Sequence, residues 1–483
     1  MAGTMQKTAN DIALWSSQNF RDWLGCQVNA GRVVFTLAVL IGMVLRFHRL
    51  DDVSMTADEG FAWAAAAQSV SRLLQLQPML DSGKLAVYDL LLHYWIAIFG
   101  DSLHSMRGLS AAIDTLSILL MFALVRELYQ AFADQAGKTG ELAGGFAALL
   151  FATNLAIVQS GRTARMYSLM TAAELGEMVF FVRAQRRGRM SDNILAALFL
   201  ALAIAANFTA AFILVSEAFW LAYLLIARSK RLPGSALHVG GPALSLVGGL
   251  ALLLPWRRAA SSLLREGMRN RDFGWIPYQP PIHWSYEVLR ASTSNEWLFT
   301  LFLALAAFAI WRHRNETPLI PMFMAAAMVG PFAAVAIASL FGVPMMVDRY
   351  VLIAVIAFLG LAAIGAASFE SKFPPIVIFG LIVCSARAVK PPSVDWRQAA
   401  AIANAASFAN ARIGVVPVFA LDVVRYHLPP ERRAFAVGLK SQCGVPHILI
   451  VSPGSISSPL MSALKSCYPR LLGRDQFLEI RAR

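Results

Sequence analysis

The sequence predicts an all-α membrane protein with many spans, followed by a small soluble α/β domain at its C-terminal end. Of the 483 residues, 57% are hydrophobic and only 15% are charged, whereas about 25% of the residues in a typical soluble domain are charged. The apolar residues arrive in separate blocks, each about long enough to cross a bilayer. Together with a mean hydropathy of +0.57, these observations argue against a water-soluble globular protein. The low charge and the 30 Phe and 11 Trp exclude a disordered chain.

The net charge of +13 is carried largely by short basic runs between the apolar blocks. Such runs are typical of the cytoplasmic ends of membrane helices, so the positive charge does not indicate a nucleic acid partner. We expect the basic clusters at 183–189, 228–231 and 312–314 to be cytoplasmic, and an even number of spans must then separate each pair. The apolar stretch Ile194–Ala227 is therefore predicted to be a hairpin of two helices that turns near Asn207.

The block Tyr88–Phe99 is too short and too polar for a span, so we expect it to lie along the outer membrane surface as an amphipathic helix. Residues 1–24 lack the apolar core of a cleavable signal peptide, and the stretch Val33–Leu45 is expected to be a retained anchor. About eleven spans result, with the N-terminus in the cytoplasm and the C-terminus outside. Besides the hairpin, they are expected at 33–47, 108–126, 142–160, 166–182, 237–255, 295–311, 319–341, 349–368 and 374–389.

The composition changes after Pro391-Pro392. The segment that follows contains one helical stretch, Trp396–Ala409, and two short apolar runs bounded by turn residues, Gly414–Ala420 and His447–Val451. Alternation of a helix with short buried strands is typical of an α/β domain. We therefore expect a transmembrane domain at residues 1–390 and an extracytoplasmic soluble domain at residues 391–483.

Two of the four cysteines, Cys443 and Cys467, fall in the C-terminal segment. In an oxidising compartment they could form a disulfide, but their spacing says nothing about their geometry. A disulfide and two free thiols therefore both remain open.

The predicted topology gathers most chemically interesting side chains on the outer side of the membrane. So many outer arginines oppose the usual bias of positive charge toward the cytoplasm. An arginine at the membrane boundary suits a phosphate, because its planar guanidinium binds two oxygens and stays charged. These observations suggest a lipid phosphate as the anionic ligand. The residues concerned are Arg46, His48, Arg49, Asp51, Asp52, Asp58, Glu59, Arg162, Arg165, Tyr167, Arg257, Arg258, Arg265, Arg269, Arg271, His283, Asp348, Arg349 and Tyr350.

The string Arg46-Phe-His-Arg-Leu50, followed by Asp58-Glu59, resembles the first outer loop of the GT-C glycosyltransferases. The group it resembles most comprises the protein O-mannosyltransferases and the bacterial lipid A aminoarabinose and galacturonic acid transferases (glycosyltransferase family 39 and relatives). Five further motifs follow in that family's order: Tyr88–Trp95 with Phe99–Ser102, Met106–Ser110, Thr163–Ser168, Asp348–Tyr350 and Asp395–Arg397.

The sequence departs from this family at two points. The usual Pro-Pro before the surface helix is Leu85-Ala86 here. The polar pair that is often Gln-Glu before the motif's Ala-Arg is Arg162-Thr163, so a family carboxylate has no counterpart at that position.

The resemblance implies transfer of a sugar from a polyprenyl-phosphate carrier to an acceptor outside the cytoplasm. A base must take the acceptor's proton, cations must stabilise the departing phosphate, and a single displacement inverts the sugar's configuration. The resemblance assigns the base to Asp58 and the donor phosphate to Arg165. Glu59 is expected to assist Asp58 or to share a divalent cation with it. The alternative is that Asp58 only caps the helix that starts at Glu59.

Six further residues are weaker candidates, each with an ordinary structural alternative. Arginines at a membrane boundary also serve as anchors, and tyrosines there are commonly interfacial. A histidine more often satisfies a local hydrogen bond than binds a ligand, and no residues at metal-ligand spacing support a metal site. The candidates are Arg107 and Arg349 for the donor phosphate and Tyr167, His93, His283 and Tyr350 for the substrate. A divalent metal remains open.

Two other functions remain open. A transporter or lipid flippase would explain the many helices, but it typically carries ionisable residues near the midplane and repeated halves. Glu174, Glu177 and Glu217 are the main charges within the apolar spans, and no repeat is visible. An O-antigen ligase or polymerase would use diphosphate-linked oligosaccharides, and the Asp58-Glu59 loop argues mildly against it. The sugar and the acceptor (lipid A or lipopolysaccharide core, an envelope glycan, or a protein hydroxyl) are left undetermined. The membrane is expected to be a bacterial-type inner membrane.

Overall fold

The computed structural model describes most of the chain, and the structural statements below refer to the described residues. These are residues 30–81, 83–133, 137–258, 261, 276, 278–293, 295–341, 343, 345–369, 373–385, 395–405, 411–438, 448–452, 458–474 and 478–482.

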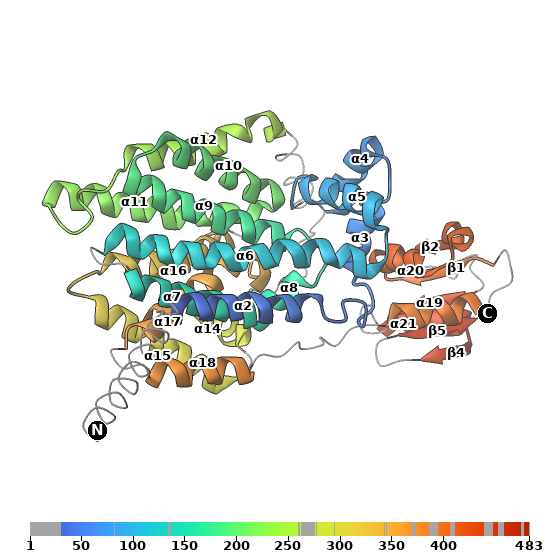
Figure 1. Ribbon diagram of the computed structural model, residues 1–483. Coiled ribbons are helices and arrows are strands. Elements are labelled where there is room, and N and C mark those ends of the chain that lie inside the picture. The colour runs from blue at the N-terminus through green and yellow to red at the C-terminus, as the bar shows by residue number, and fades with distance from the viewer. Residues whose placement is uncertain are drawn as a thin grey trace, which may run out of the picture.

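Long apolar helices packed side by side make up most of the molecule (Figure 1). Within the described residues, six helical segments are long and apolar enough to cross a membrane. They are α2 (Ala30–Phe47), α6 (Leu103–Phe132), η1 with α11 (Phe208–Lys230), α15 (Glu296–His313), α16 (Leu319–Leu340) and η3 with α17 (Asp348–Ala367). The protein is therefore a multi-pass membrane protein.

Further helices run along this bundle. They are α9 (Tyr167–Arg187), α10 (Met190–Ala206), α12 (Gly240–Leu252) with the short η2 (Leu254–Trp256), and α18 (Phe373–Ser385). Helix α9 packs between α6 and α10, and α17 packs against α7, α15 and α16. The whole of α17 is buried, which explains why its sequence is apolar on every side. The expected total of about eleven spans stays a prediction.

The predicted hairpin is confirmed, with its turn at Asn207 between α10 and α11. The side-chain oxygen of Asn207 accepts hydrogen bonds from the backbone N–H (3.0 Å) and the hydroxyl (2.8 Å) of Thr209. Because asparagine offers the backbone this local alternative to helical bonding, it ends one helix and begins the next.

The helix expected to span 142–160 is not continuous, because it breaks at Asn154, and the crossing itself stays a prediction. Helix α7 (Gly137–Thr153) and helix α8 (Leu155–Gly161) meet at an angle of 64°. The side chain of Asn154 accepts a hydrogen bond from the Ile157 N–H (3.2 Å), so it caps the new helix. Its amide also donates to the carbonyl of Ser292 (3.0 Å). This last contact connects α8 to α14 (Pro281–Ser292). A local sequence pattern cannot predict it, because the two residues are 138 positions apart.

Three short helices follow α2 at one end of the bundle (Figure 1). They are α3 (Ala57–Ala66), α4 (Val70–Leu80) and α5 (Val87–Phe99). Helix α5 corresponds to the expected surface helix: Tyr88 and Leu92 are buried, whereas Ile98 and Phe99 are exposed. Helices α4 and α14 were not predicted.

The C-terminal part of the chain contains the expected small α/β unit, beside α3 in Figure 1. Its five-stranded sheet has the order β2-β1-β3-β5-β4. The central strands β1 and β3 are parallel and fully buried, which explains their continuous apolar sequences. The elements are α19 (Trp396–Ala405), β1 (Ile413–Val416), η4 (Val418–Ala420), α20 (Leu421–His427), η5 (Pro430–Phe435), β2 (Ala436–Gly438), β3 (Ile448–Val451), α21 (Ser458–Cys467), β4 (Arg470–Arg474) and β5 (Glu479–Ala482).

Cys467, the last residue of α21, is disulfide-bonded. The other cysteine of the expected pair, Cys443, lies outside the described residues.

Helix α20 of this unit packs directly on α3. A side chain at Gly60 would meet Val423, because an added Cβ would lie 2.8 Å from its Cγ2. The rings of Trp63 and Tyr426 pack edge to face with centroids 5.3 Å apart, and the guanidinium of Arg433 lies 5.0 Å from the centroid of the Trp63 ring. The C-terminal unit therefore holds the short helix that carries Asp58 and Glu59.

Candidate active site

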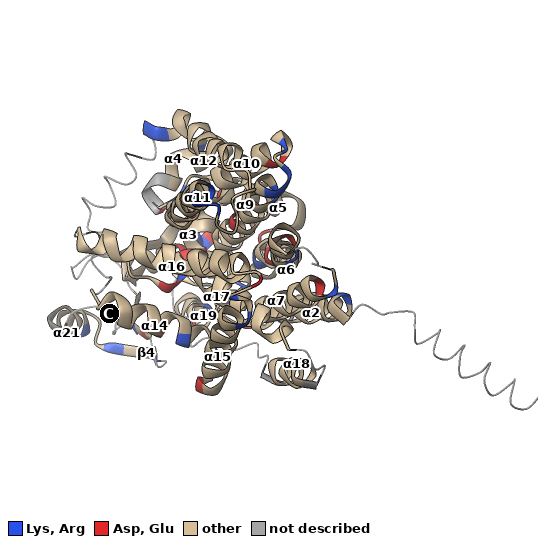
Figure 2. Cartoon of the chain, turned by 90° about the vertical axis from the view of Figure 1, so that its left-hand side faces the viewer, with Lys and Arg blue, Asp and Glu red and all other residues tan. Residues whose placement is uncertain are grey.

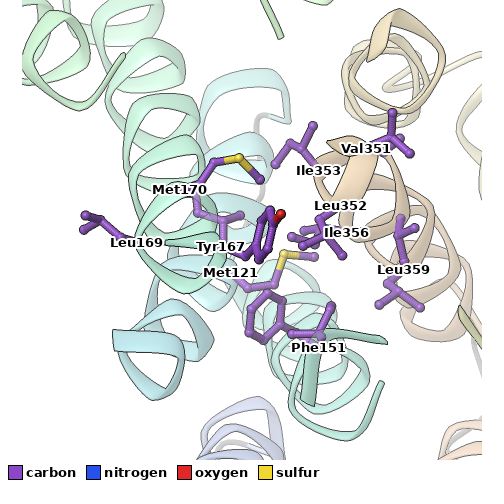
Figure 3. Close-up of a cluster of buried hydrophobic side chains, with 14 of the residues drawn as sticks. Met121, Phe151, Tyr167, Leu169, Met170, Val351, Leu352, Ile353, Ile356 and Leu359 are labelled. Atoms are coloured by element: carbon purple, nitrogen blue, oxygen red, sulfur yellow. The ribbon is translucent and has the colours of Figure 1, made fainter. Parts of the chain in front are cut away.

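A cavity of about 450 Å³ lies between the α2–α3 connection, α8, α14 and the start of α17. This volume falls within the roughly 300–1,000 Å³ typical of small-molecule sites. One part of its wall is apolar, and another carries charged side chains. Leu352 of α17 and Tyr167 of α9 both line it, and Figure 3 shows them side by side within a cluster of buried side chains that also contains Met121 and Ile356. The packed interior of the bundle therefore forms a fixed base for the cavity.

Asp58 is the second residue of α3 and lines the cavity. Its side chain is 38% exposed, and one carboxylate oxygen lies 3.7 Å from Nη1 of Arg349. The interpretation of Asp58 as a helix cap is wrong, because Thr56 occupies the N-cap position and its hydroxyl accepts the Glu59 N–H. Since Asp58 has no capping contact, its carboxylate is free to face the cavity.

Glu59 is buried and holds the backbone around it together. Its carboxylate accepts hydrogen bonds from Arg107 (Nε and Nη2, both 2.7 Å), from the Ala164 N–H (2.9 Å) and from the Thr56 N–H (2.8 Å). Burial raises the pKa of Glu59, but the hydrogen bonds and the charge of Arg107 outweigh burial and leave the pKa below its ordinary value. A carboxylate with this many donors has no free lone pair for a proton or a cation. The roles expected for Glu59, base assistance and metal binding, stay predictions, and these contacts do not support them.

Arg107 is the partner of Glu59, and all five of its N–H donors are engaged. Two point to Glu59, and the other three donate to the carbonyls of Leu50 (2.6 Å), Val53 (2.8 Å) and Ser54 (3.2 Å). Arg107 lines the cavity, but its N–H donors are all used within the protein, so the phosphate-binding role expected for it stays a prediction that these contacts do not support. Arg107 instead fixes the connection that leads into Asp58.

Arg165 is buried beside the cavity and connects to Asp58 through the backbone. Its Nη1 donates to the Asp58 carbonyl (3.1 Å), and its Nη2 donates to a carboxylate oxygen of Asp81 (2.6 Å). The N–H at Nε is buried and has no partner among the described residues. The guanidinium is therefore held in place by Asp81, while its Nε–H has no partner among the described residues.

Asp81 belongs to a buried network of charges that the sequence analysis missed. Its carboxylate lies 3.8 Å from Nζ of Lys84, which in turn pairs with Asp89 at 2.8 Å. Burial raises the pKa of Asp81, but the charges of Arg165 and Lys84 outweigh burial and keep it below its ordinary value. Asp81 and Lys84 lie in a short connection outside the recognised motifs, so the only available signal was the presence of charges beside an apolar helix.

Arg349 and the two tyrosines also gather near Asp58. The guanidinium of Arg349 lies 5.7 Å from the ring centroid of Tyr167, at a distance typical of a cation–π contact. Arg349 and Tyr167 line the cavity. Tyr350 is half-buried nearby, where its hydroxyl senses the charges of Arg349 and Asp81, but it is not part of the cavity wall.

The two histidine candidates lie elsewhere. Nδ1 of His93 bonds to the carbonyl of Ala66 (2.8 Å), which links α5 to the end of α3. His283 is exposed on α14. Neither lines the cavity, so their expected roles in substrate binding stay predictions without support from this site.

Two arginines expected in the outer loops are structural. Arg46 lies in the last turn of α2, where it is buried and paired with Asp114 at 2.6 Å. Arg162 donates to backbone carbonyls at and after the end of α2, among them those of Leu45 (2.8 Å) and His48 (2.7 Å). Arg265, Arg269 and Arg271 lie outside the described residues.

The described residues do not contain a cluster of ligands suited to a divalent metal. In the part of the chain that the structure describes, no group of three or more His, Cys, Asp or Glu side chains could hold one. The expected pair of Asp58 and Glu59 is also unsuitable, because the Glu59 carboxylate is saturated by N–H and O–H donors.

Comparison with known proteins finds a family model that matches part of the sequence and solved structures that share the fold. A family model described as dolichyl-phosphate-mannose-protein mannosyltransferase matches residues 86–256. ArnT from Cupriavidus metallidurans bound to undecaprenyl phosphate superposes with a TM-score of 0.57 at 12% identity, covering 92% of this chain and 97% of that one. The chain has the GT-C glycosyltransferase fold.

Other structures with this fold support the same conclusion. ArnT from the same organism in the apo state gives a TM-score of 0.59 at 12% identity, covering 92% of this chain and 97% of that one. The oligosaccharyltransferase of Archaeoglobus fulgidus, in complex with Zn and sulfate, gives 0.51 at 11% identity and covers 87% of this chain and 68% of that one. A search of curated protein sequences found no match. The GT-C resemblance of the sequence motifs is thus confirmed at the level of the fold.

Proposed function

We propose that the protein transfers a sugar from a polyprenyl-phosphate-linked donor to an acceptor hydroxyl of the cell envelope, on the extracytoplasmic face. The observation that carries this proposal is the meeting of one carboxylate, Asp58, with two guanidinium groups, Arg165 and Arg349, in a cavity that also has an apolar wall. The GT-C fold and the match to a mannosyltransferase family model support it.

The cavity suits a ligand that is anionic at one end and hydrocarbon at the other. Leu155, Ala156, Val288, Leu352 and Val355 line its apolar part, which matches an isoprenoid chain. Arginine is the residue best suited to phosphate because it offers paired donors and a permanent charge. We assign the donor phosphate to Arg349 and to the free Nε–H of Arg165. An undecaprenyl phosphate ligand in the similar ArnT structure is consistent with such a donor.

In the proposed reaction, the acceptor oxygen attacks the anomeric carbon while Asp58 takes the hydroxyl proton. The bond between the anomeric carbon and the phosphate oxygen breaks, and the polyprenyl phosphate leaves with the bonding electrons. Arg349 and Arg165 stabilise the charge that develops on this phosphate. Attack opposite to the leaving group inverts the anomeric configuration.

Glu59 and Arg107 act in this proposal as positioning residues. Their ion pair joins α3 and α6, and the N–H of Ala164 binds the same carboxylate. Asp58 and Arg165 each adjoin this junction in the sequence. The pair therefore sets the distance between Asp58, the proposed base, and Arg165, the residue proposed to bind the phosphate.

The proposed orientation places the cavity and residues 391–483 outside a bacterial-type inner membrane and the N-terminus inside, with residues 1–390 as the catalytic transmembrane domain. Supporting this, the C-terminal sheet lies at the end of the bundle that also holds α3 and α5 (Figure 1). Figure 2 looks onto the opposite end, where Lys and Arg positions, drawn in blue, lie at several helix ends. Arg183 and Arg186 share Glu127 at the end of α9, as expected for cytoplasmic positive charge.

The test is transfer activity of the full chain in lipid, with undecaprenyl-phosphate hexoses as donors. We expect Asp58→Asn to lower the rate by about 100-fold or more, which is typical of losing a general base, without changing the amount of folded protein. The matched control is Asp52→Asn, which alters an exposed carboxylate of the same connection that does not line the cavity. Near-normal transfer by Asp58→Asn would refute its role as the base.

The acceptor is best identified from cells. Mass spectrometry of envelope lipids and glycans from a deletion strain should show the loss of one sugar residue from one component. An unchanged envelope together with altered uptake or lipid distribution would instead favour transport.

A further inference from the structure

Half of the uncharged polar side chains on the cavity wall already have partners within the protein. Among the described residues, six such side chains line the cavity: Thr56, Gln159, Ser160, Thr163, Tyr167 and Ser292. The hydroxyl of Thr56 donates to Glu59 (3.1 Å), that of Thr163 to the carbonyl of Gln159 (2.9 Å), and that of Ser292 to the carbonyl of Leu289 (2.7 Å). These three hydroxyls have already used their only proton.

The side chains of Gln159 and Ser160 differ from these three because their hydrogen-bonding groups are not used within the described part of the protein. Neither makes a hydrogen bond to any described residue, and both are only half-buried. The third uncommitted group, the Tyr167 hydroxyl, was already singled out by sequence. An amide offers two donors and an acceptor, and a serine hydroxyl offers one donor and two lone pairs. Adjacent groups of this kind complement a ligand that carries several hydroxyl groups.

The position of Gln159 and Ser160 relates them to the rest of the cavity. They lie four residues after Leu155 and Ala156 on α8, and residues four apart share one face of a helix. The cavity face of α8 is thus apolar in its first turn and polar in its second. This polar turn is followed in the chain by residues 162–165, which include Arg165, the residue proposed to bind the phosphate.

We infer that Gln159 and Ser160 are specificity-determining residues that bind the hydroxyl groups of the donor sugar. This inference rests on the proposed function and deepens it, because it separates the contacts to the sugar from those to the phosphate. Both side chains are neutral, and the proposal assigns the charge of the phosphate to Arg165 and Arg349. A site built to bond a hydroxyl discriminates strongly against an analogue that lacks it, since its polar groups are then left unpaired.

The bend at Asn154 makes this arrangement. Because α8 departs by 64° from the direction of α7, its short length lies along the cavity wall. Asn154 also bonds the carbonyl of Ser292 in the facing helix α14. The spacing between the polar turn of α8 and α14 is therefore set by a single side chain.

The experiment compares Gln159→Leu and Ser160→Ala with the matched control Ser292→Ala. The control removes a cavity hydroxyl that already donates to the backbone. Two quantities are measured on the full chain in lipid: kcat/KM for a panel of undecaprenyl-phosphate hexoses that differ at one hydroxyl, and inhibition by undecaprenyl phosphate, which has no sugar.

For Gln159→Leu we expect kcat/KM for the preferred hexose to fall about tenfold, the size of one lost hydrogen bond, and selectivity among the hexoses to narrow. Inhibition by undecaprenyl phosphate should stay unchanged, which also shows that the variant is folded. Ser160→Ala should act in the same direction, and Ser292→Ala should behave as the wild type. Unchanged selectivity in both variants, or an equal weakening of undecaprenyl phosphate, would overturn the inference.

Failure of this inference can be told apart from failure of the proposed function. If the wild-type chain transfers sugar and Asp58→Asn does not, while the Gln159 and Ser160 variants keep normal selectivity, only the inference is lost. If the wild-type chain uses no polyprenyl-phosphate sugar of the panel and does not bind undecaprenyl phosphate, both are lost.

Discussion

The two neighbouring carboxylates Asp58 and Glu59 should fail in different ways when they are neutralised. The side chains of Glu59 and Arg107 are 0% and 5% exposed, respectively. In Glu59→Gln, the guanidinium of Arg107 would therefore stay buried without its anionic partner. One carboxylate oxygen would also become an NH₂ group facing the N–H donors of Arg107 and of either Ala164 or Thr56. Breaking a buried ion pair by removing one partner costs about 3–5 kcal/mol.

The assay for this prediction is the free energy of unfolding in mixed micelles, measured alongside sugar transfer. Glu59→Gln should lose about 3–5 kcal/mol of stability together with most activity, whereas Asp58→Asn should lose activity with little change in stability. A double-mutant cycle with Arg107→Met should show strong coupling, because the second substitution removes the unpaired charge.

One result would refute this reasoning. If Glu59→Gln kept wild-type stability but had no activity, Glu59 would take part in the reaction directly, and its role in positioning the α3–α6 junction would be wrong.

Three further predictions concern the parts that hold the cavity in place. Gly60→Val should destabilise the protein by about 1–3 kcal/mol through overpacking against Val423. Gly108→Ala should leave the stability unchanged, because an added Cβ there would meet only one atom, at 4.0 Å. Equal shifts of the unfolding temperature in the two variants would contradict the docking of α20 on α3. Asn154→Ala should cost about 1–2 kcal/mol by removing the cap of α8 and should raise KM for the donor; an unchanged KM would mean that the bend does not shape the cavity. Burial lowers the pKa of His427 to about 4, so the imidazole binds a proton more readily in the unfolded chain than in the folded protein. The stability should therefore fall as the pH drops from about 6.5 to about 4. Thermal unfolding of a His427→Gln variant should not show this pH dependence.

The family motifs predicted part of the candidate site from the sequence alone. The order of weak motifs was enough to select Asp58, Arg165, Tyr167 and Arg349, and the structure brings all four to one cavity. The same motifs also selected Arg107, whose donors all serve the protein itself. A motif identifies a residue type at a position and does not say whether its donors face a ligand or the backbone.

The helices followed from the amino-acid sequence because their cause is local: continuous apolar blocks, basic residues between them and an asparagine at the hairpin turn. Other features depend on partners that are distant in the chain. Glu59 and Arg107 are 48 positions apart, Arg165 and Asp81 are 84 apart, and Asn154 and Ser292 are 138 apart. No periodic pattern encodes such pairs, since a side chain's partner is set by which helices pack together. The sequence thus determined where most of the long apolar helices lie and which chemistry is available, and the packing of the helices decided which charges are neutralised inside the protein and which face the cavity.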